Sequence, residues 1–152
     1  MNSRTPPSTR SAYVHFCDIA TRWMDNDMYG HVNNVVYYSY FDTAVNQYLI
    51  ARGVLDPLRS GQIGLVVETQ CRYFSSLAFP DLVRVGIRVG HIGSSSVRYE
   101  LGVFRNDEDT ACAEGHFVHV YVDRESNRPA PLADDFRQAL QALTVAKTAA
   151  AN

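Results

Sequence analysis

Hydrophobic and polar positions follow two different periods along this chain. Residues 34–52 are mostly apolar or aromatic, and their polar side chains recur every three or four positions, at Ser39, Asp42, Thr43, Asn46 and Gln47. This spacing predicts one long helix with the polar side chains on one face. Because that polar stripe is narrow, most of the helix surface must be covered by other parts of the chain. Gly53 is expected to terminate the helix.

The other regular segments show the alternation typical of β-strands. A first strand is predicted over residues 13–23, which are rich in β-branched and aromatic side chains. Four more are predicted after the long helix, over residues 63–73, 83–89, 97–103 and 111–122. Their short connections favour antiparallel pairing. Residues 131–143 are expected to form a short amphipathic helix, with Asp134 and Asp135 in its early turns.

This order of elements predicts an α+β protein in which an antiparallel sheet curls around one long helix. A chain of 152 residues is large enough to bury a core without disulfides. We expect a single domain over residues 13–145, a mobile leader over residues 1–12 and a tail over residues 146–152.

Composition and charge exclude several classes of protein. The net charge of −2 gives no basic surface for nucleic acid or membrane. Lys147 is the only lysine and lies in the predicted tail, which argues against a catalytic lysine. Cys17, Cys71 and Cys112 are far apart and contain no CxxC pair, as expected of reduced thiols in a cytoplasmic protein. The first residues lack the apolar segment of a signal peptide, and no apolar run approaches the ~20 residues that span a bilayer.

Candidate chemistry is concentrated in the loop before the long helix. Asp25, Asp27, His31, Asn33 and Asn34 lie within ten residues. A helix N-terminus has unpaired backbone N–H groups and a partial positive charge, so it can stabilise an oxyanion. A nearby carboxylate could attack a reactive acyl group or deprotonate a water. The same residue types are also common in helix caps and turns, so from the residues alone a structural role stays open.

The segment in question also resembles a known family. Residues 22–37 read RWMDNDMYGHVNNVVY and are followed by Tyr40, Phe41 and Asp42. This pattern resembles the N-terminal signature of hotdog-fold acyl-CoA thioesterases, in the branch of the 4-hydroxybenzoyl-CoA thioesterase family that carries Asp-x-x-x-His-Val-Asn-Asn. The later Arg72–Tyr73, Pro80–Asp81 and the strand around Ser94–Val97 are also similar to the family pattern. The similarity extends over residues 13–143, although only the first motif is specific.

The resemblance implies a fold, an assembly and a set of site residues. The fold is a hotdog, in which a bent five-stranded antiparallel sheet wraps a long central helix, and two copies pair into a homodimer that can form a homotetramer. The active site lies at the dimer interface. Asp27 matches the catalytic carboxylate, and the backbone N–H of Asn34 matches the group that polarises the thioester carbonyl. His31 and Asn33 are expected to shape the pocket or orient water. The tyrosines of the predicted helix are expected to be mainly core, with Tyr37 or Tyr38 near its start lining the acyl pocket.

One part of the sequence departs from this family. Some relatives carry a basic run before the fourth strand that grips the phosphates of coenzyme A, and here the matching positions are Ile92, Gly93 and Ser94. The resemblance of this strand to the family makes Ser94, Ser95 and Ser96 candidate substrate-binding residues. Arg84, Arg88 or Arg98 could substitute for the basic run. No separate cofactor is expected, since coenzyme A would be part of the substrate.

Other ionisable residues are assigned as follows. Asp25 is expected to be structural. Glu68 is either a second catalytic carboxylate or a strand residue that faces solvent beside Gln70 and Arg72. His116 and His119 are three positions apart in a strand, so they face opposite ways and are poor joint metal ligands.

The leading prediction is therefore a soluble acyl-CoA thioesterase with no metal. Two alternatives are kept. One is a hotdog enoyl-CoA hydratase or dehydratase, although the Asp/His spacing that such relatives need is missing. The other is a non-catalytic acyl-CoA-binding hotdog protein, although residues 1–12 are too short and not basic enough for the DNA-binding extension of such sensors.

Overall fold

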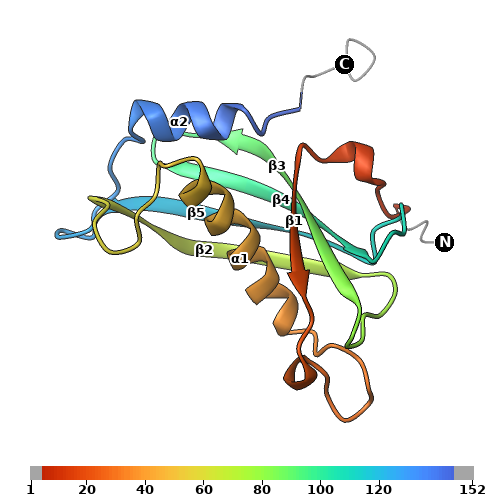
Figure 1. The fold of residues 1–152 in the computed structure, drawn as a ribbon. Helices are drawn as coiled ribbons and strands as arrows, with labels where there is room; N and C mark the ends of the chain where they lie inside the picture. Colours follow the sequence, from red (N-terminus) through yellow and green to blue (C-terminus); the bar gives the residue numbers. More distant parts are fainter. Residues whose placement is uncertain (1–4, 146–152) are drawn as a thin grey trace.

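The computed structural model describes residues 5–145, which form a five-stranded antiparallel sheet with a long helix against one face (Figure 1). Its strands are β1 (His15–Ala20), β2 (Gln62–Tyr73), β3 (Leu82–Ile92), β4 (Ser96–Arg105) and β5 (Ala113–Asp123). Its helices are α1 (Val36–Ala51) and α2 (Asp134–Gln141), with short 3-10 turns at Arg10–Ala12 and Trp23–Asp25. The strand order β1-β3-β4-β5-β2 leaves β1 and β2 at the edges. The predicted α+β class and element order are confirmed.

Helix α1 follows its sequence pattern closely. Its buried side chains are Tyr37, Tyr40, Phe41, Ala44, Val45, Tyr48 and Leu49, whereas the polar stripe lies outside the core. The helix ends as predicted, because Gly53 has a φ of 74° and its N–H donates to the Ile50 oxygen at 3.0 Å. The N–H of Val54 donates to the Leu49 oxygen at 3.1 Å, which completes a Schellman motif.

Phe41 fixes the seat of α1 on the sheet. Its ring centroid lies 6.1 Å from that of Phe117 in β5, and Phe117 in turn lies 5.6 Å from Tyr99 in β4. Gly115 makes room for this contact, because a Cβ at that position would lie 2.7 Å from Phe41 Cε2 and closer still to the Gln70 backbone oxygen. The absence of a side chain at Gly115 therefore allows the helix to approach the sheet.

Helix α2 closes the end of the sheet that lies beside the C-terminus of α1 (Figure 1). The Tyr48 hydroxyl donates to the Ala139 oxygen at 2.7 Å, and the ring of Phe136 packs 4.7 Å from that of Tyr121. After α2, the Val89 N–H donates to the Leu143 oxygen at 3.0 Å. The two helices and the sheet thus share one core.

The structure differs from the expectations mainly at element ends. Strand β1 stops at Ala20 instead of residue 23, because Trp23–Asp25 forms a 3-10 turn. Helix α1 begins at Val36 instead of residue 34, because the preceding residues form a turn in which the Val36 N–H donates to the Asn33 oxygen.

Residues 1–12 were predicted to be a mobile leader, but part of this segment contacts the rest of the domain. The Arg10 side chain donates to the backbone oxygens of Asn106 and Glu108, at 2.8 and 2.9 Å. The Ala111 N–H donates to the Ser8 oxygen at 2.9 Å. The predicted tail over residues 146–152, including Lys147, and the start of the leader over residues 1–4 lie outside the described residues.

The seat of α1 can be tested by adding one methyl group at Gly115. We expect Gly115→Ala to lower the free energy of unfolding by about 2 kcal/mol, because neither the Phe41 ring nor the backbone of β2 can move away without cost. Chemical denaturation measures this change. Gly61→Ala is the matched control, since a Cβ there meets nothing within 4 Å. Equal stability of the two variants would contradict this account.

Candidate active site

The loop before α1 is anchored by the buried carboxylate of Asp25, which is 1% exposed. It accepts hydrogen bonds from the Arg22 amide at 2.9 Å, from the Arg22 guanidinium at 3.0 and 3.1 Å, and from the Tyr40 hydroxyl at 2.9 Å. Burial alone would raise the pKa of Asp25, but these hydrogen bonds outweigh it and lower the pKa below its ordinary value. The predicted structural role of Asp25 is confirmed.

Backbone hydrogen bonds fold the loop into a narrow hairpin. The Asn33 N–H donates to the Asp25 oxygen at 2.9 Å, and the Asp27 N–H donates to the His31 oxygen at 2.9 Å. The Gly30 N–H returns to the Asp27 oxygen at 3.0 Å, and Gly30 has a φ of 81°, a conformation that favours glycine. The hairpin therefore brings Asp27 and His31 opposite one another.

The Asp27 carboxylate is partly exposed and only partly engaged. Its Oδ1 atom accepts a hydrogen bond from the Tyr29 N–H at 2.9 Å, which holds the carboxylate in the turn. Among residues 5–145, no hydrogen bond to Oδ2 and no ion pair to Asp27 is present. One oxygen of this carboxylate is thus available to a water or a substrate.

The amides at the entrance to α1 are paired with one exception. Among the described residues no hydrogen bond is donated by the N–H of Asn34, and this residue is exposed. The neighbouring amides all have partners, namely Val32 with Leu77 O (2.8 Å), Asn33 with Asp25 O (2.9 Å), Val35 with Asn33 Oδ1 (3.1 Å) and Val36 with Asn33 O (2.9 Å). The turn therefore presents one free N–H donor beside the positive end of the helix.

Tyr73 at the end of β2 also belongs to this site, although the sequence had not assigned it a role there. Its hydroxyl donates to the Asn34 backbone oxygen at 3.0 Å, and its ring packs edge-on to that of Tyr37 at 4.9 Å. Both tyrosines line a pocket of about 260 Å³, together with Val32, Asn34, Phe74, Ser75 and Ser76. The sequence signals of Tyr73 were its place at the end of a predicted strand and the resemblance of Arg72–Tyr73 to the family pattern.

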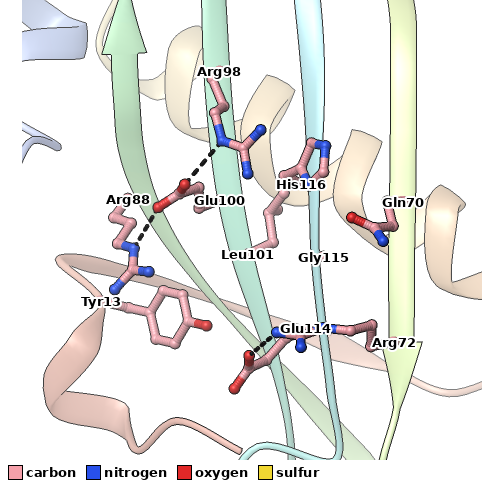
Figure 2. A pocket seen from close by; sticks show the side chains of 10 residues that line it. All are labelled: Tyr13, Gln70, Arg72, Arg88, Arg98, Glu100, Leu101, Glu114, Gly115 and His116. Carbon is pink, nitrogen blue, oxygen red and sulfur yellow. Dashed lines mark hydrogen bonds and ion pairs between the residues drawn. The ribbon is translucent and has the colours of Figure 1, made fainter. Parts of the chain in front are cut away.

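Glu68 lies on the face of the sheet that points away from α1. Its carboxylate is 2.7 Å from His116 Nε2, and His116 lines a polar pocket on the face of the sheet that points away from α1 (Figure 2). Gln70 and Arg72 line the same pocket, so Glu68 has the position expected of a strand residue beside them. Within one chain, the structure does not bring Glu68 to Asp27. His116 and His119 face opposite ways as predicted, since His119 is buried on the helix side.

The serines proposed to bind substrate are also remote from the loop in the same chain. Strand β3 begins beside the loop, where the Asp81 backbone oxygen accepts a hydrogen bond from the Thr21 N–H, and it runs for 11 residues to the turn that carries Ser94 and Ser95. At roughly 3.3 Å per residue this is on the order of 35 Å. Ser94–Ser96 can therefore serve the site only through a partner subunit.

The three arginines considered for coenzyme A are engaged in ion pairs. Arg88 and Arg98 both bind Glu100, at 2.8 and 2.9 Å, on the face of the sheet shown in Figure 2. Arg84 lies 3.4 Å from Asp18 and 3.3 Å from the exposed Asp107.

Two further observations concern the described part of the chain. Within residues 5–145, no three His, Cys, Asp or Glu side chains are grouped so that they could hold a metal ion. The helices of the same region are too short or too polar to cross a membrane.

The fold and the site together define a hotdog protein with a free backbone donor and a carboxylate at the entrance of its central helix. A family model described as the thioesterase-like superfamily matches residues 21–140, so the chain belongs to that superfamily and the resemblance seen in the sequence is confirmed.

The chain is also similar to solved structures and to a curated relative. The chain is 52% identical to the PA5185 protein from Pseudomonas aeruginosa strain PAO1, covering 94% of this chain and 100% of that one, with a TM-score of 0.91. The PA2801 protein of Pseudomonas aeruginosa, provisionally named a thioesterase, is 31% identical over 84% of this chain and 98% of its own, with a TM-score of 0.77. The uncharacterised protein YsmA of Bacillus subtilis (strain 168) is 26% identical over 132 residues, 86% of this chain and 88% of its own.

The anchoring role of Asp25 predicts a pH-dependent loss of stability. We expect Asp25→Asn to lower the free energy of unfolding by about 3 kcal/mol at pH 7, because donors from Arg22 and Tyr40 lose their charged acceptor. The folded-state pKa lies below the ordinary 3.8, so the contribution is complete above that pH and is lost as the pH falls through the folded-state pKa. The two proteins should therefore converge in acid.

Denaturation at several pH values measures this difference. Asp109→Asn serves as the control, because Asp109 is exposed in a turn. A difference between wild type and Asp25→Asn that stays constant down to pH 2, or that is no larger than the Asp109→Asn effect, would contradict the anchoring role.

Proposed function

We propose that the protein hydrolyses an acyl thioester, in particular an acyl-CoA, to a free acid and a thiol. The observation that carries this proposal is the free N–H of Asn34 among otherwise paired amides. A donor of this kind, fixed before the substrate arrives, is suited to a carbonyl oxygen that gains negative charge in the transition state. One such donor is typically worth about 2.7–4 kcal/mol there.

The substrate carbonyl would lie against Asn34, within the pocket formed by Tyr37 and Tyr73. The hydrogen bond from the Tyr73 hydroxyl to the Asn34 oxygen helps to keep this residue in place. The lining of this pocket is mostly apolar, so a bound acyl group would displace water from it, and less water would then compete for the N–H and the developing charge.

Asp27 would supply the reacting carboxylate by one of two routes. In the first, it takes a proton from water, the water oxygen bonds to the carbonyl carbon, and the carbon–sulfur bond breaks. In the second, an Asp27 oxygen attacks the carbonyl carbon and expels the thiolate, and water then hydrolyses the resulting mixed anhydride. In both routes the products are the acid and the thiol. A thiolate leaves readily, which suits a site with no evident general acid.

The working unit is proposed to be a dimer that pairs β2 with β2 of a second copy. Strand β2 is a 12-residue edge strand with exposed apolar side chains, and Leu65, Val66 and Val67 are 43%, 50% and 61% exposed. Such an edge normally pairs or is protected. The loop beside the site also exposes Trp23, Met24, Met28, Tyr29 and Val35, as expected of a surface that a partner covers. This assembly, or a tetramer built from it, would bring partner residues such as Ser94–Ser96 to Asp27.

Free-thiol release from short, long and aromatic acyl-CoAs tests the chemistry. We expect Asp27→Asn to lower kcat at least about 100-fold on the best substrate, because the amide can neither attack nor deprotonate water. Glu68→Gln is the matched control and should have a much smaller effect, since Glu68 faces away from α1. The opposite order would mean that Glu68 is the reacting carboxylate. Hydration of an enoyl-CoA without thiol release would instead favour a hydratase.

A charge in the middle of β2 tests the dimer. If a two-fold axis passes near the centre of this strand, Val67→Lys places two like charges close together. We expect this variant to shift towards monomer in light scattering and to lose thiol release in proportion. Val14→Lys is the control, because Val14 is also exposed, at 45%, but precedes the other edge strand. A wild type that is monomeric while fully active would rule the dimer out.

A further inference from the structure

Two consecutive peptide groups decide where the N–H of Asn34 points. The first joins Asn33 to Asn34, and its carbonyl oxygen accepts a hydrogen bond from the Val36 N–H at 2.9 Å. This peptide group is trans, so its C=O and N–H bonds lie in one plane and point in opposite directions. The Asn34 N–H therefore points away from Val36 and the first turn of α1, and it has no partner among residues 5–145.

The second peptide group, which joins Asn34 to Val35, is held by side chains. Helix α1 begins after this group, and the backbone donates to its carbonyl oxygen only at a long 3.4 Å, from the Tyr37 N–H. The same oxygen accepts a shorter hydrogen bond from the Tyr73 hydroxyl, at 3.0 Å. At the other end, the Val35 N–H donates to Asn33 Oδ1 at 3.1 Å. One side chain from β2 and one from the loop thus hold this peptide group from opposite ends.

The Tyr73 hydroxyl is presented by the sheet and not by the loop itself. Tyr73 is the last residue of β2 and pairs with Ala113 of β5. The next amide, that of Phe74, donates to the Cys112 oxygen at 2.8 Å. The Tyr73 ring packs edge-on to that of Tyr37 at 4.9 Å, and Tyr37 is only 2% exposed. A ring that is fixed by strand pairing and by a buried neighbour presents its hydroxyl at a defined position.

The placement of the Asn34 N–H matters because a preformed donor acts only where charge develops in the transition state. The two peptide groups share the Asn34 Cα atom, so a rotation of the second group can tilt the first. Without the Tyr73 hydroxyl, the Asn34 oxygen would keep its long backbone contact and would take water in place of the phenol. Water has no fixed position, and a displacement of about 1 Å in a reacting geometry can lower a rate about 100-fold.

We propose that Tyr73 is a positioning residue for the thioester hydrolysis, and that its hydroxyl, together with the side-chain oxygen of Asn33, fixes the direction of the Asn34 N–H. Tyr73 acts through Asn34 and not on the reacting atoms. The donor in the loop is thereby coupled to the edge strand β2, although Asn34 and Tyr73 are 39 residues apart. This assignment rests on the proposed hydrolysis of a thioester at Asn34.

Thiol release from the best acyl-CoA substrate tests this role. We expect Tyr73→Phe, which keeps the ring, to lower kcat about tenfold and to leave KM within about twofold, because a misplaced donor weakens binding of the transition state and not of the substrate. An unchanged kcat in Tyr73→Phe, or a higher KM at unchanged kcat, would overturn the proposal.

Tyr13→Phe is the matched control for this measurement. It also removes one hydroxyl that makes a hydrogen bond, 2.9 Å from Ser8 Oγ, but Tyr13 lies on the face of the sheet that points away from α1 (Figure 2). Its kcat should equal that of the wild type. An equal loss of kcat in both variants would reduce the role of Tyr73 to general stability and would overturn the proposal.

A measurement on the ligand-free protein separates this proposal from the proposed activity. ¹⁵N relaxation reports the picosecond-to-nanosecond motion of the Asn34 amide. In the wild type and in Tyr13→Phe we expect an order parameter near the rigid value of about 0.85, and in Tyr73→Phe a fall towards the flexible range below about 0.6. Equal order parameters in all three proteins would overturn the role of Tyr73 even if thioesters are hydrolysed. A fall in Tyr73→Phe without hydrolysis of any thioester would leave the positioning in place and refute the activity.

Discussion

The buried carboxylate of Asp25 holds together three segments on which the site depends. Its side chain binds Arg22 before the loop and Tyr40 in α1, while its backbone oxygen binds the Asn33 amide on the return side of the loop. A carboxylate that is almost completely buried is tolerated here because hydrogen-bond donors surround both of its oxygens. The loop therefore cannot shift relative to the helix without breaking these bonds, and the positions of Asp27 and Asn34 follow from this constraint.

Much of the fold could be predicted from the sequence, because local periodicity and tertiary burial agree. The stripe of polar residues and the glycine after it predicted a helix with one polar face that ends at Gly53, and both features are present in α1. The ends of elements were less predictable. The strand that was expected to reach residue 23 gives way to a 3-10 turn because Asp25 draws the Arg22 amide to its carboxylate, a side-chain interaction that alternation does not encode.

The candidate site was only partly predictable for a related reason. Asp27 and Asn34 lie in one loop, so a motif and a helix start were enough to suggest them. Tyr73 comes from a distant strand, and the role suggested by its contact with Asn34 depends on pairing in the sheet. Glu68 shows the converse. Its charge inside an apolar run made it a candidate catalytic residue, but the bulge and pairing of β2 put it opposite Val118, and its carboxylate reaches His116 on the face away from α1.

Helix α1 and the edge strand β2 together frame the candidate site. The free amide lies at the start of α1, Tyr73 of β2 holds the same residue, and β2 is the edge at which we expect a second copy to pair. The central claim is that the Asn34 N–H binds the reacting carbonyl. A crystal structure with an acyl-CoA analogue that has a CH₂ group in place of the thioester sulfur tests it most directly. Our account predicts the ketone oxygen about 2.7–3.1 Å from the Asn34 nitrogen. A ketone bound elsewhere, with this amide still facing solvent, would contradict it.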